Sequence, residues 1–213
     1  MSSFRPLTDS TEDLPIPRWP ADPLEAISMF HRGKDPAHQT LRRLIKRLEK
    51  ANIPHAVMGG MAVYAHGYRR LTDDVDVLLT RESFEEFKRR FVPKNYEPVP
   101  GRSRRFTDRA NGVTVDVLLT GLYPGMGKPG PIAFPDPVSV RQQINDMQYI
   151  DQLTLIQLKL AARRHQDFAD VVNLIRANNL DESYLDRLHP SLRQDFIECL
   201  EEKCRDDEYQ ARE

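Results

Sequence analysis

Two copies of one hexapeptide carry the residues whose types and spacing could do chemistry. Val-Asp-Val-Leu-Leu-Thr occurs at Val75–Thr80 and again at Val115–Thr120. Because side chains alternate between the faces of a strand, Asp74 and Asp76 share one face of the first copy, and Asp116 lies on the matching face of the second. If the two strands are neighbours, about 4.8 Å apart, the three carboxylates converge. Such a repelling cluster is tolerated when a divalent cation neutralises it, and an all-oxygen site suits Mg²⁺ or Mn²⁺.

A pair of glycines precedes the first hexapeptide. A short strand that ends at Met58 meets Gly59 and Gly60, and a short helix follows. Glycines let a backbone approach an anion, and free N–H groups at a helix start attract phosphate. Alone, two glycines at a strand end are more often a plain tight turn. With Asp74 and Asp76 a short helix later, the pattern is more specific, because a phosphate-binding turn would then lie beside metal-binding carboxylates.

Four polar residues in the C-terminal half form a further candidate group. Lys159, Arg163, Asp167 and Asp170 follow at spacings of four, four and three, which predicts one polar stripe. An ammonium group there could reach the β- or γ-phosphate of a nucleotide. The alternative is an exposed ladder of ion pairs, each worth only about 0.3 to 0.5 kcal/mol. The pattern favours phosphate binding for Lys159 and leaves both interpretations open for Arg163 and Asp167.

A cluster of arginines lies between the two hexapeptides. Arg102, Arg104, Arg105 and Arg109 surround Phe106. They could bind a nucleic-acid acceptor, and arginines on a solvated strand face explain the pattern equally well.

Hydrophobic periodicity predicts the elements that position these residues. Apolar residues at spacings of three and four predict an amphipathic helix over Pro36–Ala51, and another helix is expected over Ser83–Phe91. A strand pair is expected near Arg102–Arg109. The turn signal Asn111-Gly112 then predicts that the strand before it runs antiparallel to the strand that carries Asp116.

The chain after the second hexapeptide divides into an irregular stretch and a helical end. Residues 121–137 are rich in glycine and proline, so no regular element is expected there, and either a functional flap or a plain connector fits. Beyond it the pattern is helical. We expect an α/β (α+β) fold, with a mixed sheet flanked by helices. Its divisions are a flexible proline-rich arm at 1–23, a core at 24–137, and a small helical region at 138–213 packed on the core.

Composition narrows the class of protein. Lys and Arg total 31 of the 213 residues against 32 for Asp and Glu, so a net charge of -1 gives no general attraction to nucleic acid or anionic membrane. The two cysteines exclude a disulfide framework, and no apolar run is long enough for a membrane span. We expect a cytoplasmic protein with no membrane partner.

The segment Val57–Leu79 resembles the signature of the polymerase-β-type nucleotidyltransferase superfamily. It reads Val-Met-Gly-Gly-Met-Ala-Val-Tyr-Ala-His-Gly and then, from Arg70, Arg-Leu-Thr-Asp-Asp-Val-Asp-Val-Leu-Leu. The likeness is greatest to minimal bacterial proteins grouped with abortive-infection type IV toxins. The segment Leu158–Asp170 is similar to a later motif of this group, in which a helix carries Lys and Arg ahead of an acid.

The resemblance implies a nucleotidyltransferase that binds a nucleoside triphosphate with Mg²⁺ or Mn²⁺. It would transfer the nucleoside monophosphate to a hydroxyl of an RNA, a protein or a small molecule. Its metal-binding and catalytic residues would be Asp74, Asp76 and Asp116, and its nucleotide-binding residues Gly59, Gly60, Lys159 and Arg163.

Two positions depart from the family pattern. The commoner serine after the first glycine is replaced by Gly60, and a lysine often found before the later acid is replaced by Gln166. Both changes reduce the anchoring of a triphosphate. One alternative to an active enzyme is therefore a catalytically silent nucleotide-binding or regulatory protein with the same fold. A purely structural module is a further alternative, and it requires the three acids to point apart.

Overall fold

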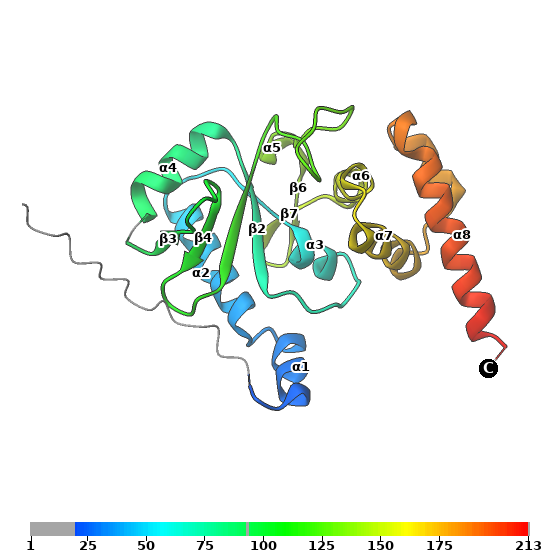
Figure 1. The fold of residues 1–213 in the computed structure, drawn as a ribbon, viewed down its shortest axis with the longest axis horizontal. Helices are drawn as coiled ribbons and strands as arrows, with labels where there is room; N and C mark the ends of the chain where they lie inside the picture. The colour runs from blue at the N-terminus through cyan, green and yellow to red at the C-terminus, as the bar shows by residue number, and fades with distance from the viewer. Residues whose placement is uncertain (1–19, 93, 213) are drawn as a thin grey trace, which may run out of the picture.

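One mixed sheet of seven strands organises the molecule (Figure 1). The computed structural model describes residues 20–92 and 94–212, so most of the arm expected at 1–23 lies outside the described residues. In spatial order the strands are β3 (Tyr96–Pro98), β4 (Arg105–Asp108), β5 (Thr114–Leu119), β2 (Asp74–Leu79), β1 (Ala56–Met58), β7 (Met147–Ile150) and β6 (Arg141–Ile144).

The two hexapeptides lie side by side in the middle of this sheet. β2 and β5 run parallel, with Asp76 directly opposite Asp116. Val77 and Val117 are 0% and 2% exposed, as the alternation of strand side chains predicts. The expected hairpin is also confirmed, because β4 pairs with β5 in the antiparallel sense.

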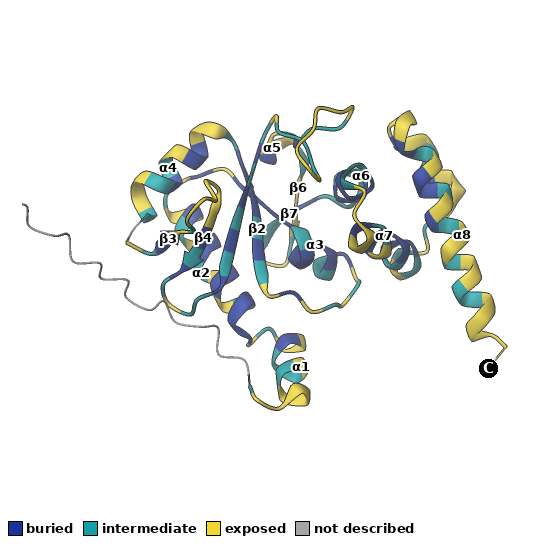
Figure 2. Ribbon diagram, viewed as in Figure 1, coloured by how far each residue is buried: buried dark blue, intermediate teal, exposed yellow. Residues whose placement is uncertain are grey.

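Helices cover both faces of the sheet, which confirms the predicted α/β class (Figures 1 and 2). On one face, α2 (Pro36–Lys50) and α4 (Arg81–Phe91) pack on the valines of β2 and β5. On the other, a second apolar cluster joins α3 (Gly59–Ala65), α6 (Gln152–Ala162), α7 (His165–Asn178) and α8 (Arg193–Gln210). The remaining elements are α1 (Pro23–His31), α5 (Pro137–Val140) and two 3₁₀ helices at Glu182–Arg187 and Pro190–Leu192. Among the described residues, no helix has the length and apolarity to cross a membrane.

Helix α2 shows why the sequence pattern identified its boundaries well. The Asp35 carboxylate accepts hydrogen bonds from the backbone N–H groups of Ala37 and His38, and Pro36 occupies the first turn. Both features satisfy or remove N–H groups that have no partner within the helix. The helix ends where Asn52 adopts a left-handed backbone, at φ 52°.

The expectation of a purely helical end is wrong for residues 141–150. This segment forms a β6–β7 hairpin, and β7 pairs with β1 in the parallel sense at Tyr149 opposite Val57. The signal was missed because β6 is an edge strand that reads Arg-Gln-Gln-Ile and offers almost no apolar alternation. The irregular stretch before it is confirmed up to Asp136, where α5 follows.

A buried acid fixes β4 against α2. Asp108 is 1% exposed, and its carboxylate accepts hydrogen bonds from Thr40 at 3.0 Å and from the Arg43 guanidinium at 2.7 and 3.1 Å. Thr40 and Arg43 belong to α2, so this contact joins the β4–β5 hairpin to the helical layer.

Replacing Asp108 is expected to destabilise the fold more than removing an exposed ion pair. Asp108→Ala leaves the Arg43 charge without its partner and should lower the free energy of unfolding by about 3 kcal/mol. The control is Glu86→Ala, because Glu86 pairs with Arg89 and Arg90 on the surface of α4, and the loss of an exposed pair should cost far less. Urea unfolding of both variants measures the difference. Equal losses would contradict a structural role for Asp108.

Candidate active site

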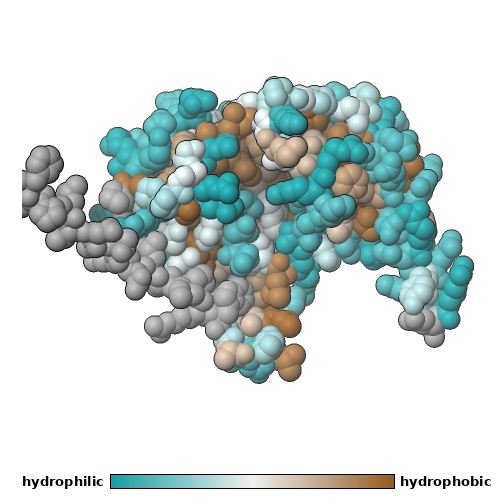
Figure 3. Space-filling view, viewed as in Figure 1, coloured by the Kyte–Doolittle hydropathy of each residue, from teal (hydrophilic) through white to brown (hydrophobic). Residues whose placement is uncertain are grey.

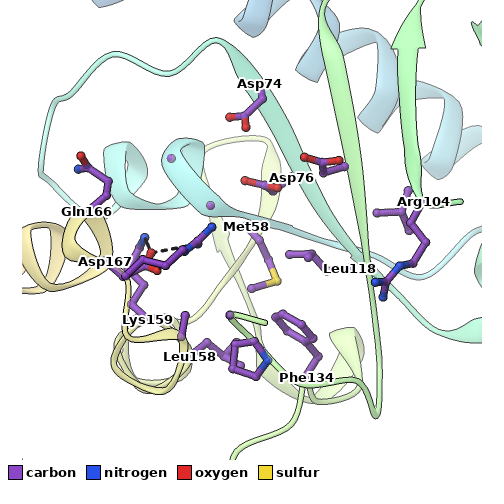
Figure 4. Close-up of a pocket in the computed structure, with 18 of the residues that line it drawn as sticks. Met58, Asp74, Asp76, Arg104, Leu118, Phe134, Leu158, Lys159, Gln166 and Asp167 are labelled. Atoms are coloured by element: carbon purple, nitrogen blue, oxygen red, sulfur yellow. Dashed lines mark hydrogen bonds and ion pairs between the residues drawn. The ribbon is translucent and has the colours of Figure 1, made fainter. Parts of the chain in front are cut away.

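Three carboxylates converge on one face of the central strands. Asp74, Asp76 and Asp116 each offer an oxygen, and these atoms lie within 4.8 Å of one another. Figure 4 shows Asp74 and Asp76 at this site. All three are half-buried. The expectation of convergence is therefore confirmed, and the alternative in which the acids point apart is excluded. An all-oxygen set of this size fits a hard divalent cation such as Mg²⁺ or Mn²⁺.

Asp76 is the acid most affected by this arrangement. Burial, followed by the charges of Asp74 and Asp116, raises its pKa from 3.8 to about 7, against smaller opposing contributions from Lys159 and Arg164. Burial and mutual repulsion therefore favour keeping a proton in the cluster when no cation is bound. A divalent cation would remove this effect, which is a second indication that the residues suit one.

Neighbouring side chains hold the other two acids in place. The Arg105 guanidinium donates to both oxygens of Asp116, at 2.8 and 2.6 Å, from the adjacent strand β4. The Thr72 hydroxyl donates to Asp74 at 2.8 Å from the loop that precedes β2. Neither role was predicted from the residue pattern, although the expected antiparallel hairpin already makes the strand of Arg105 the neighbour of the strand of Asp116.

The two glycines give room to the side chains of Asp76 and Thr72. Gly59 has φ +60°, and a Cβ there would lie only 1.7 Å from Oδ2 of Asp76. A Cβ on Gly60 would lie 2.6 Å from the Thr72 hydroxyl oxygen. Helix α3 begins at Gly59 itself and not after the glycine pair as expected, because the glycines form its first turn. The chain can turn this closely above β2 only without side chains at both positions.

Lys159 belongs to a buried network of ion pairs. Its ammonium donates to Asp167 at 2.9 Å and to Asp170 at 2.7 Å, and the Arg70 guanidinium donates to Asp170 at 2.6 Å. Burial opposes ionisation of Asp170, yet the hydrogen bond from Arg70 and the charge of Lys159 hold its pKa below the usual value. Lys159 lines the candidate pocket, but two carboxylates already engage its ammonium.

The prediction of a single polar stripe is wrong. Helix α6 ends at Ala162, Arg163 adopts a left-handed backbone at φ 55°, and α7 begins at His165. The turn sends the Arg163 side chain to Asp195 of α8, at 2.7 and 2.9 Å, and Arg163 is not among the residues that line the pocket. Arg164 lines it instead. Regular helical spacing could not reveal this exchange, because the helix breaks between the two arginines.

The carboxylates lie in a pocket of about 800 Å³. The arginines near β4 (Arg102, Arg104, Arg105) form one of its other walls. Gly59, Gly60 and Arg164 form another, and residues 123–127 of the irregular loop form a third. Met58, Leu118, Phe134 and Leu158 form an apolar region (Figure 4). Figure 3 shows hydrophilic surface on both sides of this hollowed face. The loop thus contributes a pocket wall and is more than a connector.

Asp76→Asn is expected to raise the melting temperature of the metal-free protein and to abolish the rise caused by Mg²⁺. Folding raises the pKa of Asp76 from 3.8 to about 7, so ionising it costs stability as the pH increases through that window. The gain from Asp76→Asn should therefore be larger at about pH 8 than at about pH 5. Thermal unfolding with and without Mg²⁺ measures both effects. Asp146→Asn, an exposed acid in the β6–β7 turn, is the control, and a Mg²⁺ response that survives Asp76→Asn would contradict the metal site.

Comparison with known proteins agrees with this geometry. A family model described as uncharacterised nucleotidyltransferase matches residues 13–194. No curated protein gives a match. Similar solved structures include JHP933 from Helicobacter pylori, with 15% identity, 70% of this chain and 69% of that chain covered, and a TM-score of 0.42.

Two further structures show a similar level of likeness. ANT(2″)-Ia in complex with adenylyl-2″-tobramycin has 12% identity, 81% and 97% coverage of the two chains and a TM-score of 0.47. An antigenic nucleotidyltransferase-like protein from Paracoccidioides brasiliensis has 16% identity, 65% and 74% coverage and a TM-score of 0.42. These likenesses are low, and the assignment rests on the family model. Since that model spans most of the chain, the protein belongs to this nucleotidyltransferase family.

Proposed function

We propose that the protein transfers a nucleoside monophosphate from a nucleoside triphosphate to a hydroxyl of an RNA, a protein or a small molecule. The observation that carries the proposal is the in-register pairing of Asp76 with Asp116, which brings three acids together beside the Gly59 turn. Membership of the family supports the same general reaction. The resemblance of Val57–Leu79 also suggests a relationship to the minimal abortive-infection group.

Asp74, Asp76 and Asp116 would hold Mg²⁺ or Mn²⁺. When bound, such ions activate the attacking hydroxyl and neutralise charge on the phosphates. In the reaction, the hydroxyl oxygen forms a bond to the α-phosphorus while the bond from that phosphorus to the leaving pyrophosphate breaks. Asp116 is proposed to accept the hydroxyl proton, because it lies on the side of the cluster that faces the open arginine wall.

The triphosphate would lie over the glycine turn. Gly59 and Gly60 line the pocket beside the acids, and Arg164 presents a side chain that is 71% exposed. Lys159 contributes positive charge from helix α6, and its ion pairs with Asp167 and Asp170 fix the position of its ammonium. Arg163, expected from the sequence to bind the nucleotide, is replaced in this proposal by Arg164. Together these groups would orient the phosphates for in-line attack.

A silent nucleotide-binding protein remains the second candidate. Gln166 lines the pocket and donates to Asp170 at 3.1 Å, so it joins the ion network without adding the charge of a lysine. Metal-dependent binding of a triphosphate with no release of pyrophosphate, even in the presence of cell extract, would favour this candidate.

Labelled triphosphates, Mg²⁺ and cell extract test for transfer. The wild-type protein should move an α-phosphate label into an acceptor and release pyrophosphate. Asp76→Asn and Asp116→Asn should each lower transfer by at least about a hundredfold. The double variant should lose little more than either single variant, because residues that act through one metal site are strongly non-additive. Losses that multiply, or normal transfer by Asp116→Asn, would remove Asp116 from the site.

Arg164 and Arg163 offer a matched pair for the phosphate contact. Arg164→Ala should weaken triphosphate binding by about tenfold and monophosphate binding less, because a charged hydrogen bond to the terminal phosphates is lost. Arg163→Ala removes the same charge next to it, outside the pocket, and should change neither affinity. Isothermal titration with a non-hydrolysable triphosphate gives both values. This pair is preferable to Lys159→Ala, which would remove an ammonium shared by two buried carboxylates.

A further inference from the structure

We propose that Arg102 and Arg104 bind a phosphate group of the acceptor, so that the acceptor is a phosphate-bearing molecule. The inference rests on the proposed transfer reaction and names the substrate class of the same pocket. Both residues line that pocket, and neither belongs to the carboxylate cluster or to the glycine turn.

The order of the strands places these arginines on the acceptor side. β4, β5, β2 and β1 are successive neighbours, so the acids on β5 and β2 lie between the arginines beside β4 and the glycines that follow β1. Arg104 accordingly lies across the acids from Lys159 and Asp167 (Figure 4). In an in-line displacement the entering and leaving oxygens are on opposite sides of the phosphorus. If the leaving pyrophosphate points toward Arg164, the acceptor hydroxyl enters from the opposite side, which is the side of Arg104.

Within the cluster at 102–109, Arg102 and Arg104 differ from the other two arginines in having no acid to neutralise them among the described residues. Arg105 is engaged by Asp116, and Arg109 pairs with Glu97. Arg102 and Arg104 are exposed, and neither has an ion-pair partner within residues 20–92 and 94–212. The whole chain carries a net charge of -1, so these cations do not reflect a generally basic surface. Guanidinium groups at the wall of a cavity recognise phosphate through paired N–H groups.

The neighbouring acids explain why a phosphate-bearing acceptor would need positive charge from these arginines. A phosphate-bearing acceptor is repelled by Asp74, Asp76 and Asp116, and positive charge beside its path offsets that repulsion. A cationic acceptor would need no such cations and would be repelled by them. The arginine wall therefore selects acceptors that are themselves anionic, whether the phosphate belongs to an RNA strand or to a small metabolite.

Binding measurements with matched probes test the proposal. The probes are glucose, glucose 6-phosphate and a 5′-labelled single-stranded RNA of about twelve nucleotides with a free 3′ hydroxyl. The proteins are the wild type, the double variant Arg102→Gln/Arg104→Gln, and Arg141→Gln, an exposed arginine on β6 outside the pocket. Titrations in Mg²⁺ measure each probe, together with a non-hydrolysable triphosphate.

We expect the wild type to bind a phosphate-bearing probe more tightly than glucose, and the double variant to lose at least about tenfold of that affinity. Arg141→Gln should match the wild type. Tighter binding of RNA would identify a nucleic-acid acceptor, and tighter binding of glucose 6-phosphate a phosphorylated metabolite.

The proposal is overturned if glucose binds as well as the phosphate-bearing probes, or if the double variant binds them normally. Unchanged triphosphate binding by the double variant locates the loss at the acceptor side. A wild type that binds no triphosphate contradicts the transfer reaction instead.

Discussion

Repulsion among Asp74, Asp76 and Asp116 is the interaction that the surrounding structure has to offset. Two strands that carry the same hexapeptide pair in parallel and in register, so the backbone holds the carboxylates together whatever their charge. The valines on the opposite face are buried under α2 and α4, and a slip by one residue would expose them. Hydrophobic burial of one face thus maintains an unfavourable charge cluster on the other.

Positive charge reaches this cluster from two separate parts of the chain. Arg105 comes from the neighbouring strand, whereas Lys159 and Arg164 come from the helical layer and are fixed there by Asp167. Arg70, next to the loop that leads into β2, joins the same network through Asp170. The helical half is therefore part of the site and not an appendage. The parallel pairing of β7 with β1 ties it further to the sheet.

The elements with strong periodicity were predictable from sequence, and the contacts that depend on exact turns were not. The alternation in the repeated hexapeptide was enough to foresee a shared face for Asp74, Asp76 and Asp116 on condition that the two strands are neighbours, which they are. The polar edge strand β6 gave no such signal. The left-handed backbone at Arg163 was equally invisible, and it decides which of two adjacent arginines faces the pocket. Arg105 was missed because its partner Asp116 lies on the neighbouring strand. Thr72 was missed although Asp74 is only two residues away, because the conformation of a loop does not follow from residue spacing.

The close approach of Gly60 to Thr72 links two positions that are twelve residues apart in sequence. The resemblance to the nucleotidyltransferase superfamily leads one to look for a serine at position 60, but its Cβ would fall 2.6 Å from the Thr72 hydroxyl oxygen. The space beside Asp74 accommodates one hydroxyl-bearing side chain, and in this chain residue 72 supplies it. Positions 60 and 72 therefore form a single packing unit. In related chains we expect a serine at the first position to be accompanied by a smaller residue at the second, so that the two substitutions are inherited together.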